Sequence, residues 1–391
     1  MQDFTFNAHT KIIFGKNAEE NLYEHLKPYN VSGVLLHHSG GSAVKNGLIS
    51  KIKDLLQAAN INYKELSGVM PNPRLSLVNE GIALCKNNNI NFILAVGGGS
   101  VIDSGKGIAL GACDDGDVWD FYERTRTPAK SLPLGVILTI ASAGSEGSTA
   151  SVIKNEKENT KRSCVNELNR PVFAIYNPLL AQSISKYSLA TGITDSIMHT
   201  LDRYFTSYND AFITDALSEA IMKTVIKVGP IILNDPTNYE AMASLFWAST
   251  LSHNDLTHLG KPRDMSVHAL ERGISGRYDK AHPACLAIVW SSWAKYVYKT
   301  NLPQFCAFAT NVMNIDADFT NLQQTALLGI EAFATYLRTI GMPTSFKEAG
   351  INPTDEEINE IVHYAFVSAP SIGTFCKLSV EDAKNILNNA R

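Results

Sequence analysis

Four residues of this chain have the types and spacing of a metal site. Asp195 and His199 are four residues apart in TGITDSIMHTLDRYF, and positions i and i+4 share one face of a helix. His268 and His282 follow in SVHALERGISGRYDKAHPACLAIVW and add two imidazoles. One carboxylate with three neutral imidazoles suits Fe(II) or Zn(II) better than Mg(II) or Ca(II). Each pair taken alone is more typical of a solvated helix face, so only the combination favours a metal.

The other histidines have plainer interpretations. Five lack metal-like spacing, and we expect them on surfaces or in loops: His9, His25, His37, His38 and His363. His253 and His258 lie between the two candidate pairs. A lone histidine on a helix is more often structural than a ligand, and we interpret both in that way.

The elements that must position these residues change character along the chain. Apolar runs typical of buried strands lie at 31–39, 61–69, 91–100, 132–140 and 171–178, and helical patterns over 43–60, 75–89 and 101–113 separate the earlier ones. Such alternation favours a parallel sheet covered on both faces. From about residue 185 the periodicity is helical, as in 210–233, 238–255 and 321–341. Residues 3–15 alternate and suit a strand or hairpin.

The sequence therefore predicts two domains, an α/β dinucleotide-binding domain over 1–184 and an all-helical metal- and substrate-binding domain over 185–391. A chain of 391 residues exceeds one ordinary core. We expect the junction near 178–188 to be packed and the cleft between the halves to be the ligand site.

Composition excludes several classes of function. With 45% hydrophobic and 18% charged residues and a net charge of −4, the chain is typical of a soluble globular protein and favours neither nucleic acid nor anionic membranes. We find no signal peptide and no apolar stretch near the roughly 20 residues that span a bilayer. Six scattered cysteines favour a reducing cytoplasm.

A glycine-rich turn could bind a dinucleotide. Gly97, Gly98, Gly99 and Ser100 come after a predicted strand and before a helix. Glycines let the backbone approach a pyrophosphate, and the first N–H groups of a helix attract its charge. The turn matches neither GxGxxG nor GxxxxGK[ST], so a simple tight turn is the alternative. Asp103, close to the helix start, also has an ordinary helix-dipole explanation, and Lys106 could be a surface lysine.

Two further segments bear on the nucleotide. After the first strand, Ser39, Gly40, Gly41 and Ser42 offer no carboxylate to repel a 2′-phosphate, and Lys45 is close by, which favours NADP(H) over NAD(H). Residues 138–153 are rich in hydroxyls and could wrap the adenine and ribose, although a polar loop is the plainer interpretation.

Taken together, these motifs make the chain resemble the iron-containing alcohol dehydrogenases, in particular the NADPH-dependent butanol dehydrogenases. The likeness runs nearly end to end through GGSAVKNG, GVMPNPRLSLVNEG, AVGGGSVIDSGKGIA, AGSEGS, TGITDSIMHTLDRYFT and VHALERGISGRYDKAHPACLAIV. It implies the two-domain, dehydroquinate synthase-like architecture.

The resemblance also implies a set of site residues. The metal, Fe(II) or Zn(II), would be held by Asp195, His199, His268 and His282 in the domain cleft. The nucleotide would be bound by Gly40, Gly41, Ser42, Gly98, Gly99, Ser100, Asp103, Thr139 and Lys161. No catalytic residue beyond the metal ligands is implied.

Some positions depart from the family pattern. Pro283 and Cys285 replace glycines after the last ligand, and Trp290-Ser291 replaces a segment with a proline. Asp202 stands where the family usually has glutamate. We expect these changes to affect the pocket wall and hence substrate specificity.

The expected activity is hydride transfer between NADP(H), with NAD(H) as the alternative nucleotide, and a small primary alcohol or aldehyde resembling butanol or butanal. The alternatives are a glycerol-type or polyol dehydrogenase, or a sugar-phosphate cyclase-like enzyme of the same two-domain plan, using NAD(H). A cyclase needs clustered basic residues for its phosphate, and Lys261, Arg263 and Arg272 are the candidates. The third alternative is a non-enzymatic, degenerate member of the family that merely binds nucleotide or metal. The family tendency predicts a homodimer.

Overall fold

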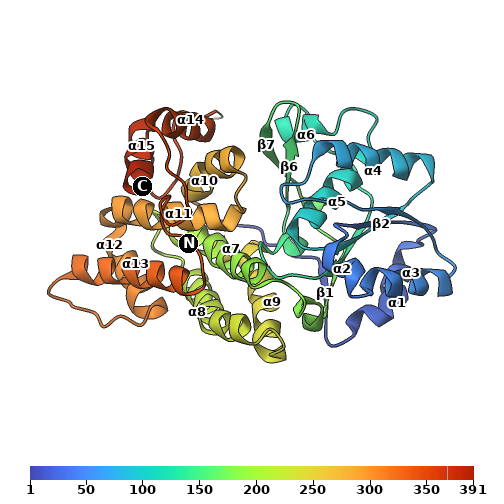
Figure 1. The fold of residues 1–391 in the computed structure, drawn as a ribbon, viewed down its shortest axis with the longest axis horizontal. Helices are drawn as coiled ribbons and strands as arrows, with labels where there is room; N and C mark the ends of the chain where they lie inside the picture. Colours follow the sequence, from blue (N-terminus) through green and yellow to red (C-terminus); the bar gives the residue numbers. More distant parts are fainter. Residues whose placement is uncertain (368) are drawn as a thin grey trace. The chain divides into compact units, whose positions relative to one another are not determined.

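The computed structural model of the chain describes residues 1–367 and 369–391. Their contacts separate two compact units (Figure 1). The sheet unit comprises Asn7–Ser185 and Pro236–Phe246, and the helical unit comprises Met1–Phe6, Lys186–Asp235 and Trp247–Arg391. A parallel-sheet unit combined with a helical unit confirms the predicted fold class.

The sheet unit is organised around a six-stranded parallel sheet in the order β1-β8-β5-β4-β2-β3. The strands of the unit, including the separate antiparallel hairpin β6–β7, are β1 Lys11–Phe14, β2 Gly33–His38, β3 Asn62–Leu66, β4 Phe92–Gly97, β5 Leu134–Leu138, β6 Ala150–Asn155, β7 Thr160–Val165 and β8 Phe173–Tyr176. Strands β2, β4, β5 and β8 are buried along their whole length, as expected for a sheet covered on both faces.

Helices cover the two faces of this sheet. They are α1 Leu22–Leu26, α2 Gly41–Lys45, α3 Leu48–Ala58, α4 Leu75–Asn87, α5 Gly99–Ala112 and α6 Trp119–Glu123. Apolar side chains of α1 and α3 pack with alternate residues of β2 and β4 in one core cluster. Helix α5 packs against β4 and β5 and against α4. Helix α5 is thus anchored with its first turn at the carboxyl end of β4.

Three local predictions for this unit were wrong. The helix expected over 43–60 breaks at Gly47, which has φ +81, into α2 and α3. The segment 138–153 is only partly a loop, because Ala150 begins β6. His37 and His38 are buried in β2, where His37 Nε2 lies 2.9 Å from Ser104 Oγ, so neither is on the surface.

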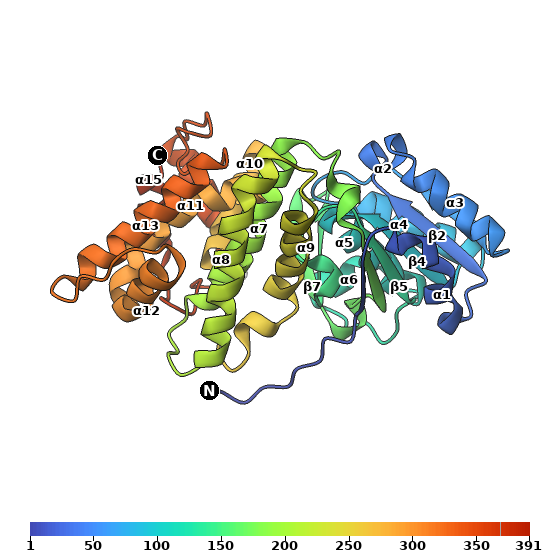
Figure 2. The same cartoon turned by 90° about the horizontal axis from the view of Figure 1, so that it is seen from below.

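The helical unit is built from α7 Lys186–Tyr204, α8 Phe212–Asn234, the last turns of α9 Tyr239–His253, α10 Ser266–Tyr278, α11 His282–Val297, α12 Leu302–Ala307, α13 Leu322–Thr339, α14 Asp355–Ala365 and α15 Val380–Asn389. Helices α7 and α8 lie side by side in Figure 2. Helix α11 packs against α7, α10, α13 and α15. It is buried on most of its surface, including both tryptophans. None of the described helices has the length and apolarity needed to cross a membrane.

Candidate metal centre and nucleotide-binding edge

The four predicted metal ligands come together in the helical unit. Asp195 and His199 project from α7, His268 from α10, and His282 is the first residue of α11. Each side chain offers one ligand atom, and these atoms all lie within 4.8 Å of one another. Asp195, His199 and His268 are buried, while the His282 side chain is 26% exposed. The group could therefore hold one ion with an opening on the His282 side.

The imidazoles turn their Nε2 atoms toward this point. Nε2 of His199 lies 3.5 Å from Asp195 Oδ1, and Nε2 of His282 lies 3.9 Å from the same oxygen. Nε2 of His268 is buried without a hydrogen-bond partner among the described residues. A buried polar atom left unpaired costs about 1–3 kcal/mol, which coordination of a cation would offset. The donor set fits a divalent transition metal.

Electrostatics also favours the ligand form of His199. Burial, together with the neighbouring His253 and His268, lowers the pKa of His199 well below its ordinary value. The ring of His253 is stacked on His199, with centroids 4.2 Å apart. A neutral imidazole keeps a lone pair available, and this is the form that binds a metal.

The glycine turns among the predicted nucleotide residues lie at the carboxyl edge of the parallel sheet, whereas Lys161 lies in β7 of the separate hairpin. The chain leaves β2 toward β3 on one side and returns to β4 on the other, so the topological switch point lies between β2 and β4. Ligands of open α/β sheets bind at such points, beyond the strand carboxyl ends. Gly98 joins β4 to α5, whose first residues are Gly99 and Ser100. A helix of 14 residues presents its first amides there.

The turn after β2 occupies the neighbouring position on this edge. Gly40 has φ +87 and Gly41 has φ +48, and residues other than glycine rarely adopt these backbone conformations. His38 Nδ1 accepts a hydrogen bond of 3.0 Å from the Gly40 amide and thereby ties the turn to the strand. Thr139 follows β5, and its amide donates to the carbonyl of Gly97 at 3.2 Å. The structure places all three segments at one end of the sheet.

Asp103 and Lys106 have a different role from the one their positions suggest. Asp103 accepts hydrogen bonds from Ser145 Oγ at 2.6 Å and from the Val152 amide at 2.9 Å. Lys106 is fully buried, and its Nζ donates to the carbonyls of Ser145, at 2.7 Å, and Ala150, also at 2.7 Å. The prediction of a surface lysine was wrong. Both side chains hold the segment that follows β5 against α5.

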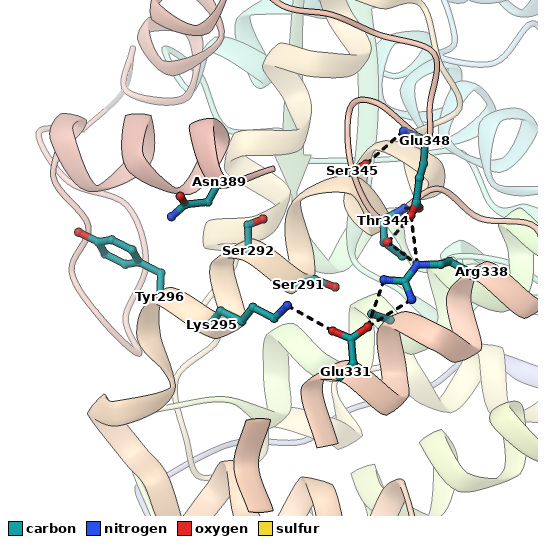
Figure 3. Close-up of a pocket in the computed structure, with 11 residues that line it drawn as sticks. Ser291, Ser292, Lys295, Tyr296, Glu331, Arg338, Thr344, Ser345, Glu348 and Asn389 are labelled. Carbon is teal, nitrogen blue, oxygen red and sulfur yellow. Dashed lines mark hydrogen bonds and ion pairs between the residues drawn. The ribbon is translucent and has the colours of Figure 1, made fainter. Parts of the chain in front are cut away.

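A separate pocket of about 300 Å³ lies elsewhere in the helical unit (Figure 3). Residues of α11, α13 and α15 and the segment after α13 line it, and none of the four candidate ligands is among them. Glu331 lies between Lys295, at 3.3 Å, and Arg338, at 3.2 Å. These charged groups are already paired with one another, so the pocket does not compete with the quartet as the candidate active site.

Comparisons with known proteins show the family of the chain. A family model described as iron-containing alcohol dehydrogenase matches residues 9–178, and one for the C-terminal part of that family matches 188–391. The probable NADH-dependent butanol dehydrogenase 1 of Bacillus subtilis is 35% identical over 99% of both chains. NADH-dependent butanol dehydrogenase A of Clostridium acetobutylicum is 35% identical over the full length of both. This chain belongs to the iron-containing alcohol dehydrogenase family.

A solved structure and a further curated relative agree with this family assignment. The crystal structure of NADH-dependent butanol dehydrogenase A from Thermotoga maritima matches with a TM-score of 0.95 and 34% identity, covering 100% of this chain and 99% of that one. The NADPH-dependent aldehyde reductase YqhD of Escherichia coli is 30% identical over 90% of each chain. The family uses a nicotinamide nucleotide and a divalent metal, and the buried Asp/His quartet is compatible with such a metal.

The departures from the family pattern take ordinary structural places in this dehydrogenase. Pro283 lies in the first turn of α11, where the missing amide hydrogen costs nothing. Cys285 is fully buried. Trp290 packs edge-on against Phe333, with ring centroids 4.6 Å apart, in the core of the helical unit. Ser291 lines the pocket of Figure 3.

Sequence reasoning missed the residues that touch the outer nitrogens of the ligand histidines. Asp202 and Glu271 are buried and lie against His268 and His282. One signal was present, since each follows a ligand histidine by three residues, in His199-Thr-Leu-Asp202 and His268-Ala-Leu-Glu271. The pattern does not reveal that each carboxylate contacts the next ligand histidine along the chain.

Proposed function

We propose that this dehydrogenase transfers hydride between NADP(H) and a small primary alcohol or aldehyde at a divalent metal held by Asp195, His199, His268 and His282. The convergence of four ligand atoms within 4.8 Å carries the proposal. The carboxyl edge of the sheet, with its glycine turns after β2 and β4, supports nucleotide binding by the same chain.

The chain contributes binding and orientation to this reaction. When bound, a divalent metal polarises the substrate oxygen, and the nicotinamide ring gives or receives the hydride. We assign the pyrophosphate to the first turn of α5, at Gly98, Gly99 and Ser100, and the adenosine ribose to the turn that contains Gly40 and Gly41. We assign no side chain beyond the four ligands to the chemical step.

The preference for NADP(H) rests on the charges around the turn after β2. Residues 39–42 carry no acidic side chain. Glu65, a carboxylate at the end of the neighbouring β3, is paired with Lys53 Nζ at 2.7 Å and with His38 Nε2 at 2.9 Å. Its charge is compensated, so it does not present a free anion to a 2′-phosphate. The curated relatives that are 35% identical are named as NADH-dependent, which makes the nucleotide a necessary test.

The nucleotide proposal is tested by kcat/KM for NADPH and NADH, measured with one aldehyde. We expect the ratio to favour NADPH. Ser42→Asp, which adds a carboxylate at the exposed start of α2, should lower kcat/KM for NADPH by roughly tenfold or more relative to NADH. Ser50→Asp, on the exposed face of α3, is the matched control. A wild-type ratio that favours NADH overturns the preference for NADP(H) and leaves the rest of the proposal standing.

The substrate class is tested by a panel of aldehydes and alcohols with protein loaded separately with Fe(II) and Zn(II). We expect reduction of butanal and similar unbranched aldehydes to exceed oxidation or reduction of polyols. Glycerol in the panel tests the polyol alternative. An absence of nucleotide oxidation with every aldehyde and both metals would refute the assignment.

The sugar-phosphate cyclase alternative finds little support among its three candidate basic residues. Lys261 is buried, and its Nζ pairs with Asp215 and lies 3.4 Å from the carbonyl of Tyr204. Arg263 is exposed and Arg272 is only half-buried. A lysine already engaged with a carboxylate does not serve as a free phosphate ligand. Product analysis with butanal and NADPH separates the two activities.

Assembly and location stay predictions. We propose a homodimer that works in the cytoplasm, with a small alcohol or aldehyde as the partner molecule. Size-exclusion chromatography with light scattering tests the first point, and fractionation of cells that express the tagged protein tests the second.

A further inference from the structure

Two buried carboxylates lie behind the candidate metal centre. Asp202 Oδ2 is 2.5 Å from His268 Nδ1, and Glu271 Oε2 is 2.6 Å from His282 Nδ1. The first contact is a hydrogen bond, and the second is an ion pair by its distance. Asp202 is 3% exposed and Glu271 is fully buried. A buried carboxylate does not contribute to solubility, so the position of each one against a ligand ring points to a role at the metal site.

These contacts select the form of each ring that binds a metal. A carboxylate only accepts hydrogen bonds, so the proton of neutral His268 belongs on Nδ1. The lone pair is then on Nε2, which is the atom that is buried without a hydrogen-bond partner among the described residues. The same reasoning places the lone pair of His282 on Nε2, toward Asp195. Each carboxylate thus directs the reactive nitrogen to the common point.

The two contacts also connect the three helices that supply the ligands. Asp202 is on α7 and contacts the ligand of α10, while Glu271 is on α10 and contacts the ligand of α11. Each carboxylate comes three residues after a ligand histidine of its own helix. One helix therefore positions the ligand of the next, and the relative placement of all three is tied to the metal site.

Formal charge around the quartet supports a divalent cation. Asp195, Asp202 and Glu271 contribute three buried carboxylates, and the buried Arg203 contributes a guanidinium. Arg203 Nη1 donates to the carbonyl of His199 at 2.6 Å. The four groups leave two negative charges in a buried region, which a divalent cation offsets. Burying such an excess without a counter-ion is costly.

We propose that Asp202 and Glu271 are positioning residues that raise the affinity of this dehydrogenase for its divalent metal by holding His268 and His282 with Nε2 toward the ion. The proposal rests on the metal site of the proposed function. Outer contacts of this kind typically contribute 10–100-fold in metal affinity.

The experiment measures Zn(II) binding directly, by competition between apoprotein and a chromophoric chelator. Asp202→Asn and Glu271→Gln keep the size of the side chain and remove its charge. We expect each to weaken Zn(II) binding roughly 10–100-fold while NADPH binding to the apoprotein, followed by its fluorescence, is unchanged. Asp202→Glu, which restores a carboxylate, should recover most of the affinity.

Asp264 provides the matched control for loss of a buried carboxylate nearby. It accepts hydrogen bonds from the amides of Ser266, at 3.0 Å, and Phe375, at 2.8 Å, its own amide donates to the carbonyl of Asp202 at 2.8 Å, and it is not a member of the ligand quartet. Asp264→Asn should leave Zn(II) affinity close to that of the wild type. Circular dichroism establishes that each variant is folded before its affinity is compared.

The outcomes separate this inference from the proposed function. Folded Asp202→Asn and Glu271→Gln proteins that bind Zn(II) as tightly as wild type overturn the positioning role and leave the metal site intact. An equal loss in Asp264→Asn also overturns it, because general electrostatics then suffices. If wild-type apoprotein itself fails to bind Zn(II) or Fe(II), the proposed metal site falls, whatever the variants do.

Discussion

The two candidate sites of this protein are made from opposite kinds of groups. At the sheet edge, the groups expected to meet a nucleotide are backbone amides and small side chains within single turns, such as Gly98–Ser100. At the metal centre, the binding atoms are side chains from three helices, separated by up to 87 positions between Asp195 and His282. A site built from one turn depends on local backbone geometry, whereas a site built from distant side chains depends on helix packing.

The difference extends to how each site is supported. The nucleotide edge is held by Lys106, whose buried ammonium gathers three carbonyls from the segment after β5. At the candidate metal centre, the carboxylates of Asp202 and Glu271 contact the rings of His268 and His282. Replacing Lys106 should therefore alter the stability of the sheet unit and its nucleotide binding. Replacing the carboxylates beside the ligand rings should alter the metal affinity of the helical unit.

The largest effect is expected from His268→Ala. Removing a ligand should lower metal affinity by more than the roughly 10–100-fold expected for an outer contact, and should abolish metal-dependent activity. NADPH binding should persist, because the nucleotide residues belong to the other unit. Metal content after dialysis measures the loss of the metal, and NADPH fluorescence titration measures the retained nucleotide binding. Full activity in a metal-free His268→Ala protein contradicts the role of the metal.

Lys106→Met tests the support of the nucleotide edge. The carbonyls of Ser145, Ser148 and Ala150 lose their donor, and a buried unpaired acceptor costs about 1–3 kcal/mol. We expect the free energy of unfolding to fall by about 3 kcal/mol and NADPH binding to weaken, with Zn(II) affinity unchanged. Urea denaturation measures the stability. Lys130→Met, at an exposed position of the segment before β5, is the control.

The same variant should change the pH dependence of stability. Burial lowers the pKa of Lys106 from its ordinary 10.5 to about 8. Between these values the unfolded chain binds more protons than the folded one, so Lys106 makes stability rise with pH from about 8 to 10.5. Lys106→Met should lack this rise. If the free energy of unfolding changes with pH equally in the two proteins over that window, the pKa of Lys106 is not lowered.

Effects of intermediate size are expected from a comparison of Gly98→Ala with Gly99→Ala. A Cβ at Gly98 would lie 2.4 Å from Ile140 Cγ2, whereas at Gly99 the nearest atom is 4.0 Å away, on Ser145. We expect Gly98→Ala to cost about 1–3 kcal/mol of stability by overpacking and to weaken NADPH binding. Gly99→Ala should be nearly neutral for stability. Thermal melting of both variants checks this, and equal losses would show that the contact with Ile140 does not decide the outcome.

The smallest effect is expected at the pocket of Figure 3. Arg338 is 42% exposed and paired with Glu331 and Glu348. Exposed ion pairs typically contribute about 0–1 kcal/mol, so Arg338→Ala should shift stability by less than about 1 kcal/mol and leave metal and nucleotide affinity unchanged. Urea denaturation and the Zn(II) competition assay test this. A fall in activity would place a function in this pocket.

Much of the fold follows from patterns that are local in the sequence. Continuous apolar runs predicted the buried parallel strands, and 3.6-residue periodicity predicted the later helices. The i,i+4 spacing of Asp195 and His199 placed two candidate ligands on one helix face. The break at Gly47 escaped prediction because the residues on both sides favour helix, and one glycine with positive φ divides them.

What only the tertiary structure decided is which groups meet. Periodicity shows that a face is buried but not what covers it, so His37, His38 and Lys106 were misplaced on the surface. Asp202 and Glu271 were unassigned because their partners lie 66 and 11 positions away on other helices. Hydrogen bonds and charge contacts act over a few ångströms, and helix packing alone brings such distant positions within that range. The sequence by itself determined the elements and the candidate ligands, and the packing decided which nitrogen each histidine presents.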